Sequence, residues 1–116
     1  MKILVTGSRD WTNRETIKRA ILRYKSYSPI IIHGDAKGAD TIAKEIALNL
    51  GLIAMGYPAD WGTYGKQAGP IRNSFMLKDN PDIDLVLAFW KNKSKGTYDM
   101  IKKAKSKEIE VKIYEE

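Results

Sequence analysis

An apolar run that breaks into a glycine turn and then into a capped helix is the feature that most restricts the fold of this chain. Residues 2–9, Lys-Ile-Leu-Val-Thr-Gly-Ser-Arg, form the first unit of this kind. Such units are typical of open α/β sheets, where the turn presents backbone N–H groups to an anion such as a phosphate. Three later segments, residues 33–40, 69–73 and 95–97, share the layout, and each follows a predicted strand or opens a predicted helix.

Hydrophobic periodicity predicts strands that alternate with helices along the whole chain. Strands are expected at residues 2–6, 30–33, 52–57, 83–89 and 108–114. Helices are expected after a capping box at residues 12–15, over residues 39–50, from residue 70 to the Asn80-Pro81 stop, and from about residue 97. The isoleucines at 30–32 indicate a central strand covered on both faces. The alternation of Ile109, Val111 and Ile113 indicates an edge strand with one face in the core.

Strands and helices in this order predict an α/β fold with a doubly wound, mainly parallel five-stranded sheet. Right-handed crossovers between parallel strands place helices on both faces of such a sheet. The length of 116 residues fits one domain, residues 1–116. Ligands of these sheets bind at the carboxyl ends of the strands, near the point where the strand order reverses. The glycine-rich segments are therefore expected to converge there.

Composition excludes several classes of protein. No apolar run approaches the roughly 18 residues that suggest a transmembrane helix. No cysteine is present for disulfides, metal thiolates or thiol catalysis. The first residues lead into a strand with no signal-peptide pattern, so we expect a cytoplasmic protein without a membrane partner. One histidine and scattered acids form no ligand constellation, and we expect neither a metal nor a cofactor.

The net charge of +6 is concentrated toward the C-terminus, where residues 91–107 hold seven lysines and only Asp99 as an acid. Two explanations stay open. A solvated helix face is favoured, because lysine is a good helix former and suits helix C-termini. A surface that attracts nucleic acid or another anion is the alternative.

The first glycine turn supplies four candidate ligand-binding residues: Thr6, Gly7, Ser8 and Arg9. A glycine allows close approach of the backbone, a serine hydroxyl can donate a hydrogen bond, and a guanidinium has forked donors that suit phosphate. A purely structural turn needs the same glycine, so both explanations stand.

The second glycine turn is the more specific signal, because its two glycines lie four residues apart and the second opens a helix with free N–H groups. Asp40 either caps this helix, which we favour, or accepts a hydrogen bond from a ribose hydroxyl. The histidine that ends the preceding strand is a candidate for ligand contact or proton transfer as well as for neutral packing in the core. The candidates here are His33, Gly34, Lys37, Gly38, Ala39 and Asp40.

The connection at residues 58–69 is long for an α/β loop and is predicted to be a binding loop or a rigid lid. Its aromatic residues, Trp61 and Tyr64, either stack on a nucleobase or form a small core of the loop itself. Arg72 is expected in the first turn of the next helix, where it either binds a phosphate bidentately or makes a surface ion pair. Further candidates are Asp60, Gly69, Pro70, Asn73, Gly96 and Thr97.

Taken together, these residues resemble a known family over nearly the whole chain. The matching segments are residues 5–11, 33–34 with 38–40, 58–61, 64–66, 68–70, 72–73 with 76, and 88–89 with 96–97. They are similar to the small YspA/YpsA-related branch of the SLOG superfamily, which includes the LOG phosphoribohydrolases, DNA-processing protein A and sensor domains for nucleotide-derived signals. The resemblance implies a Rossmann-like fold and a nucleotide or nucleotide-sugar ligand. Relatives of this fold often form dimers, so it also implies a homodimer.

The catalytic pattern of the LOG enzymes is only partly present. They carry an Arg with a Met four residues on, which Arg72 and Met76 match, and a Pro-Gly-Gly-x-Gly-Thr-x-x-Glu motif whose Glu serves the hydrolysis of a base–ribose bond. Here Gly96-Thr97 remains and Met100 stands at the Glu position. Cleavage of an N-glycosidic bond needs a carboxylate that stabilises the oxocarbenium ion or activates water. The catalytic candidates are Arg72, Asp99 and Asp35, with Asp40 and Asp60 as other sources of a carboxylate.

Three functions are therefore open from the sequence. The first is binding of a nucleotide or nucleotide-derived ligand through the glycine-rich loops. The second is a LOG-like hydrolase or transferase that acts on the N-glycosidic bond of a nucleoside monophosphate. The third is single-stranded nucleic-acid binding through the basic C-terminal region and the aromatic loop.

Overall fold

The computed structural model describes all 116 residues and contains one five-stranded sheet. The strand order is β3-β2-β1-β4-β5, and every neighbouring pair is parallel. The strands are β1 (Lys2–Gly7), β2 (Ile30–His33), β3 (Ile53–Gly56), β4 (Leu85–Trp90) and β5 (Val111–Glu115). The helices are α1 (Arg14–Leu22), α2 (Ala39–Asn49), α3 (Trp61–Tyr64), α4 (Ala68–Asp79) and α5 (Lys95–Ser106), with short 3₁₀ turns η1 (Lys25–Tyr27) and η2 (Gly65–Gln67).

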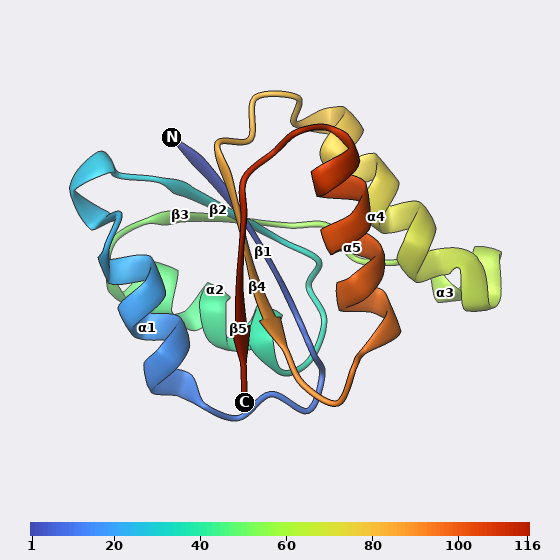
Figure 1. Cartoon of the computed structure of the whole chain (residues 1–116), viewed down its shortest axis with the longest axis horizontal. Helices are drawn as coiled ribbons and strands as arrows, with labels where there is room; N and C mark the ends of the chain where they lie inside the picture. The colour runs from blue at the N-terminus through green and yellow to red at the C-terminus, as the bar shows by residue number, and fades with distance from the viewer.

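Helices cover both faces of the sheet. In Figure 1 the helices α1 and α2 lie on one side of the strands, and α4 and α5 lie on the other. Successive residues of a strand point to opposite faces, so Ile3 and Val5 enter the core under α1 and α2 while Leu4 enters the core under α4 and α5. The predicted doubly wound α/β fold is therefore confirmed, with a sheet that is parallel throughout. None of the helices combines the length and apolar character needed to cross a membrane.

The strand order reverses between β1 and β4. The chain runs outward from β1 to β2 and β3, then returns to the other side of β1 as β4 and continues to β5. The loops that follow β1 and β4 therefore leave the sheet side by side, and Gly7 is paired with Phe89 there. In open α/β sheets this is the place where ligands bind.

Two strands differ in detail from the prediction. The isoleucine-rich strand β2 is internal and covered on both faces, but β1 occupies the centre of the sheet. The strand β5 is at the edge as predicted, yet Ile113 is 40% exposed. On the opposite face Tyr114 stacks on Phe89, with ring centroids 5.2 Å apart. Both faces of a doubly wound sheet receive helices, so an edge strand is partly covered on each face and a large ring buries more area than a β-branched side chain.

The first helix begins one residue later than its predicted capping box. Asn13 is the N-cap of α1 and its side chain accepts a hydrogen bond from the Thr16 N–H at 3.2 Å. Thr12 does not cap, because its N–H and its hydroxyl both donate to the Glu116 carboxylate. Glu15 pairs with Arg19 instead of completing the box. The long connection before α4 is folded into α3 and η2.

Gly7 is the position where the packing of β1 leaves no room for a side chain. A Cβ there would overlap with the Cβ of Ala39 on α2 and would lie 2.9 Å from the carbonyl oxygen of Phe89. We expect Gly7→Ala to reduce the free energy of unfolding by about 1–3 kcal/mol. Gly96→Ala is the control, because nothing lies within 4 Å of a Cβ in that helical position. Thermal denaturation that gives both variants the same Tm would contradict this account.

Candidate functional site

A cavity of about 420 Å³ lies where the strand order reverses. Its walls come from the end of β1, the loop between β2 and α2, the aromatic connection with α4, and the start of α5. All four glycine-rich segments contribute, so their predicted convergence is found. Ligand pockets of this size are common for small molecules.

Most of the predicted site residues line this cavity, and several lie elsewhere. Those in the cavity wall are Thr6, Gly7, Arg9, Gly34, Asp40, Trp61, Gly69, Pro70, Arg72, Asn73, Gly96 and Thr97. Those outside the wall are Ser8, His33, Asp35, Lys37, Gly38, Ala39, Asp60, Tyr64 and Asp99. Lys66, Ser94 and Lys95 were not among the predicted site residues, although all three lie in the wall. Lys66 and Lys95 each stand next to a glycine, Gly65 and Gly96, and this is the signal that could have identified them.

Arg72 connects α4 with the carboxyl end of β2. It is in the second turn of α4, one turn later than predicted. Its Nη1 donates to the carbonyl oxygens of Gly34 and Tyr57, and its Nε donates to the Asn73 Oδ1 at 2.9 Å. Burial lowers the pKa of Arg72 from its ordinary value, but a guanidinium remains charged at neutral pH. The side chain is thus a half-buried cation at the cavity wall, not half of a surface ion pair.

Asp40 does not cap α2, which corrects the interpretation favoured from the sequence. The N-cap position is Gly38, and Asp40 is one residue inside the helix. Its Oδ2 accepts hydrogen bonds from the N–H groups of Gly34 at 2.8 Å and Ala36 at 3.4 Å. Its Oδ1 is buried and has no hydrogen-bond partner. Burial raises the pKa of Asp40 to about 7, although nearby Arg72 and the two N–H groups act in the opposite direction.

The two aspartates first named as catalytic candidates lie outside the cavity wall. Asp99 accepts hydrogen bonds from Lys103 Nζ at 2.8 Å and Asn73 Nδ2 at 3.0 Å. It therefore joins α4 to α5. Asp35 lies in the neighbouring loop with a positive φ of 53° and lines an adjoining hollow. Asp40 is the only carboxylate in the cavity wall.

His33 fits the interpretation of a histidine packed neutral in the core. It is 1% exposed, and its Nδ1 accepts a hydrogen bond from the Asp35 N–H at 3.0 Å. Burial lowers the pKa of His33. Its ring packs beside Gly56, where a Cβ would lie 2.9 Å from the His33 Cε1.

Three cations in the cavity wall have no partner of opposite charge. Arg9, Lys66 and Lys95 line the wall and make no ion pair and no side-chain hydrogen bond, so their charges are available to an anion. The guanidinium of Arg9 lies over the Trp61 ring, 5.0 Å from its centroid. The first turn of α5 reaches the same wall through Lys95 and Gly96. Free backbone N–H groups and the helix dipole add to the positive potential there.

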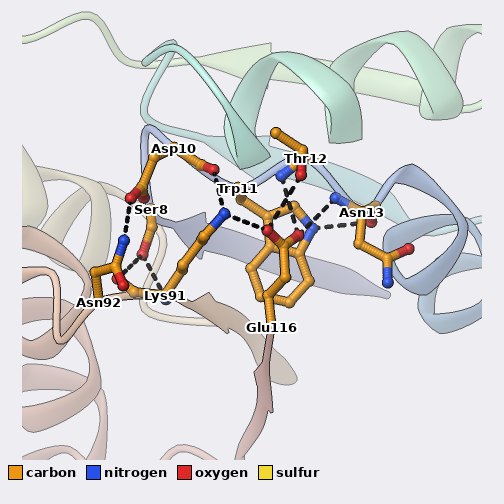
Figure 2. A network of polar contacts seen from close by, with 8 residues as sticks. All are labelled: Ser8, Asp10, Trp11, Thr12, Asn13, Lys91, Asn92 and Glu116. Atoms are coloured by element: carbon orange, nitrogen blue, oxygen red, sulfur yellow. Dashed lines mark hydrogen bonds and ion pairs between the residues drawn. The ribbon is translucent and has the colours of Figure 1, made fainter.

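A polar network ties the loops after β1 and β4 together beside the cavity (Figure 2). The Ser8 hydroxyl accepts from the Lys91 N–H at 2.7 Å and donates to the Lys91 carbonyl at 3.0 Å. Asn92 donates to the Asp10 carboxylate at 2.6 Å, and Lys91 pairs with Glu116 at 2.6 Å. Ser8 is fully buried, so its hydroxyl is used inside the protein and does not face the cavity.

Glu116 gives this network an acid dependence. Its hydrogen bonds to Lys91, Thr12 and Asn13 lower its pKa from 4.5 to about 2. A lowered carboxyl pKa stabilises the fold fully above the unfolded-state value, and the effect is lost as pH falls through the folded-state value. We therefore expect Glu116→Gln to lower the Tm at pH 7, with a difference from the parent that shrinks between pH 4.5 and pH 2. Glu115→Gln is the control, and an equal response from it would refute the assignment.

The Asp40 carboxyl is expected to give the stability of the fold the opposite pH dependence. Its pKa rises from 3.8 to about 7 on folding, so between these values the folded chain holds a proton that the unfolded chain has lost. This makes the free energy of unfolding decrease with pH across that window and level off above it. Asp40→Asn removes this titrating group. The free energy of unfolding of the variant, relative to that of the parent, should therefore rise from pH 4 to pH 7 by on the order of a few kcal/mol. Urea denaturation at several pH values measures this, with the exposed Asp60→Asn as control. A constant difference would show that Asp40 is ionised throughout.

Comparisons with known proteins agree with this architecture. The model of the family described as "YspA, cpYpsA-related SLOG family" matches residues 1–64. The Gene 61 protein of Mycobacterium phage D29 is 34% identical over 118 residues, which cover 95% of this chain and 93% of that protein.

Two solved structures share the fold. DNA processing protein A (DprA) from Streptococcus pneumoniae has a TM-score of 0.79 at 19% identity, covering 97% of this chain and 49% of that chain. TM1055 has a TM-score of 0.73 at 14% identity, covering 95% of this chain and 71% of that chain. The chain therefore spans about half the length of DprA, and at these identities the likeness is one of fold. With the family match over more than half its length and the phage relative over nearly all of it, the chain belongs to the YspA, cpYpsA-related SLOG family.

Proposed function

We propose that this protein binds a nucleotide or nucleotide-derived ligand, with the phosphate held in the cavity between β1, α4 and α5. The observation that carries the proposal is the charge of the wall. Arg9, Lys66 and Lys95 have no anionic partner, and a fourth cation, the half-buried Arg72, lines the same wall. Unpaired cations around a concave site favour an anionic ligand.

The start of α5 is the part of the wall best suited to a phosphate. Ser94 caps the helix by accepting a hydrogen bond from the Thr97 N–H. The N–H groups of Lys95 and Gly96, in the first turn, have no partner inside the helix. A Cβ at Gly96 would meet nothing within 4 Å, so the backbone is open to a ligand there. Phosphates bind at helix N-termini because free N–H groups and the helix dipole act together. The cations of the wall supply the remaining contacts.

Asp40 supports the presence of a sugar next to that phosphate. Its Oδ1 is buried without a hydrogen-bond partner while the residue lines the cavity. A buried acceptor without a donor is costly. A ribose hydroxyl would supply the missing donor, which is the ligand contact considered for Asp40 from the sequence.

A hydrolase is the second candidate, and the position of Asp40 is what favours it. Hydrolysis of an N-glycosidic bond adds water to the anomeric carbon and expels the base with a proton. Asp40 is the only carboxyl group in the wall, and a pKa of about 7 suits a group that gives and takes a proton near neutrality. Asp99 is held by Lys103 and Asn73 away from the wall.

Nucleic-acid binding remains a third candidate, and it is supported by exposed charge. Lys93, Lys102, Lys105 and Lys107 are exposed on or beside α5. The structural neighbour DprA is by its name a DNA processing protein. The cavity is a separate feature from this helix face, so the two kinds of binding can be tested separately.

A thermal-shift screen followed by chromatography separates these functions. The probes are nucleoside mono-, di- and triphosphates and a single-stranded oligonucleotide at low salt. A ligand at about a hundred times its Kd adds roughly 2.7 kcal/mol of stability. Stabilisation without released base supports binding, and stabilisation with released base supports the hydrolase. Response to the oligonucleotide alone would refute the nucleotide proposal.

Lys95→Gln tests whether the cavity is the phosphate site. Loss of one charged contact to a phosphate is expected to weaken nucleoside monophosphate binding about tenfold. Lys105→Gln is the matched control, because it removes the same charge from an exposed position of the same helix. Titration calorimetry measures both. Equal effects of the two variants would show that net charge, and not the cavity, determines the affinity.

A further inference from the structure

The contact between Arg9 and Trp61 lies at the boundary of two hollows. The cavity described above adjoins a smaller one of about 300 Å³, which Asp35, Lys37, Pro58 and Ala59 help to line. Both hollows are lined by Arg9 and Trp61 as well as by Gly34, Ala36 and Arg72. The pair joins the loop after β1 to the short helix α3.

Trp61 is suited to a partner other than Arg9. Its side chain is 47% exposed, and its indole N–H makes no hydrogen bond, unlike those of Trp11 and Trp90. Gly69 lies under the edge of the ring, since a Cβ there would be 3.5 Å from the Trp61 Cη2. A large, partly exposed aromatic ring beside a charged cavity is an efficient platform for a nucleobase.

Tyr64 belongs to a different surface. It is on the same short helix and is similarly exposed, at 49%. It lines a separate hollow with Ile71 and Phe75, which Trp61 does not line, and it is not in the wall of the cavity. The structure thus separates two aromatic residues that the sequence grouped together.

An anionic ligand would bind the Arg9 guanidinium more strongly than the Trp61 ring does. Its guanidinium makes no hydrogen bond and no ion pair, and an exposed cation–π contact is a weak interaction. Arg9 is also close enough to Arg72 to be one of the charges that lower the pKa of Arg72. A phosphate beside Arg72 would relieve this repulsion and offer Arg9 a bidentate, charge-assisted contact.

We propose that Arg9 and Trp61 form a gate that the ligand opens by exchange: the phosphate of a nucleoside 5′-monophosphate takes the Arg9 guanidinium, and its base takes the place of that guanidinium on the Trp61 ring. This rests on the proposed phosphate site and adds the location of the base. The base then lies at the junction of the two hollows. In the free protein Arg9 covers the face of Trp61 that the base needs.

The first test compares nucleoside 5′-monophosphates of the four common bases with ribose 5-phosphate, which has the same phosphate and no base. We expect at least one nucleotide to bind about tenfold more tightly than ribose 5-phosphate, because base–aromatic stacking contributes about that factor. Trp61→Ala should bring this ratio to about one, and Trp61→Phe should preserve most of it. Tyr64→Ala is the matched aromatic control and should leave the ratio unchanged.

The second test addresses the exchange itself. Arg9→Gln should weaken the binding of ribose 5-phosphate and nucleotides alike, while the ratio between them stays the same or increases, because the ring is no longer covered. Arg19→Gln removes the same charge from α1, where Arg19 pairs with Glu15, and should change neither quantity. Trp61 emission should be quenched by the nucleotide and not by ribose 5-phosphate. The emission of Trp11 and Trp90 alone is measured in Trp61→Phe.

The outcomes separate this proposal from the proposed function. If ribose 5-phosphate and the nucleotides bind equally, or Trp61→Ala keeps the ratio, the phosphate site stands and the base platform is refuted. If Arg9→Gln removes the preference for a base, Arg9 holds the base in place and the exchange is refuted. If no probe stabilises the protein, the phosphate site is refuted and the gate with it.

Discussion

The backbone and hydroxyl of Ser8 hold together three of the segments that surround the cavity. Its N–H donates to the Phe89 carbonyl at 2.9 Å, and its carbonyl accepts from Trp11 and Ala39, each at 3.2 Å. Its hydroxyl is engaged twice by the backbone of Lys91. One fully buried residue thus links the loop after β1 to the loop after β4 and to the start of α2. Buried polar groups that are fully bonded in this way fix a single arrangement.

The glycines around this serine explain how three loops fit into so small a space. Gly38 has a positive φ of 76°, and a side chain there would overlap with the backbone carbonyls of Ser8 and Arg9. Gly34 has its own close neighbours, since a Cβ would be 2.9 Å from the Asp40 carboxylate and would overlap with Arg72. The glycine-rich sequence is therefore required by packing between loops as well as by access for a ligand. This is why a glycine pattern alone does not separate the two explanations.

The sequence predicted the fold well because the signals for the fold are local. The isoleucines of β2, the apolar stripes of the helices and the turn glycines each act over a few residues, and the convergence of the turns follows from the sheet topology. Side-chain partners distant in sequence were not accessible in the same way. The bonds of Ser8 to Lys91, of Thr12 to Glu116 and of Asp99 to Asn73 join segments far apart in the chain. For Asp40, helix position suggested a cap, but its carboxylate turns back to the N–H groups of the preceding loop.

The floor of the cavity is apolar. Met76 and Met100 line it and are almost fully buried. Met100 stands where the LOG pattern has its catalytic Glu, so an apolar thioether replaces a charged oxygen at that place. The one carboxyl group that remains in the wall, Asp40, accepts hydrogen bonds from two backbone N–H groups of the loop that precedes α2. The cavity wall thus contains cations that would bind a phosphate. Its only acidic residue, Asp40, is at the start of α2 and not on α5. Under the proposed function, these cations would hold the phosphate and Asp40 the sugar, and any turnover would require Asp40 to reach the anomeric carbon from the side of α2.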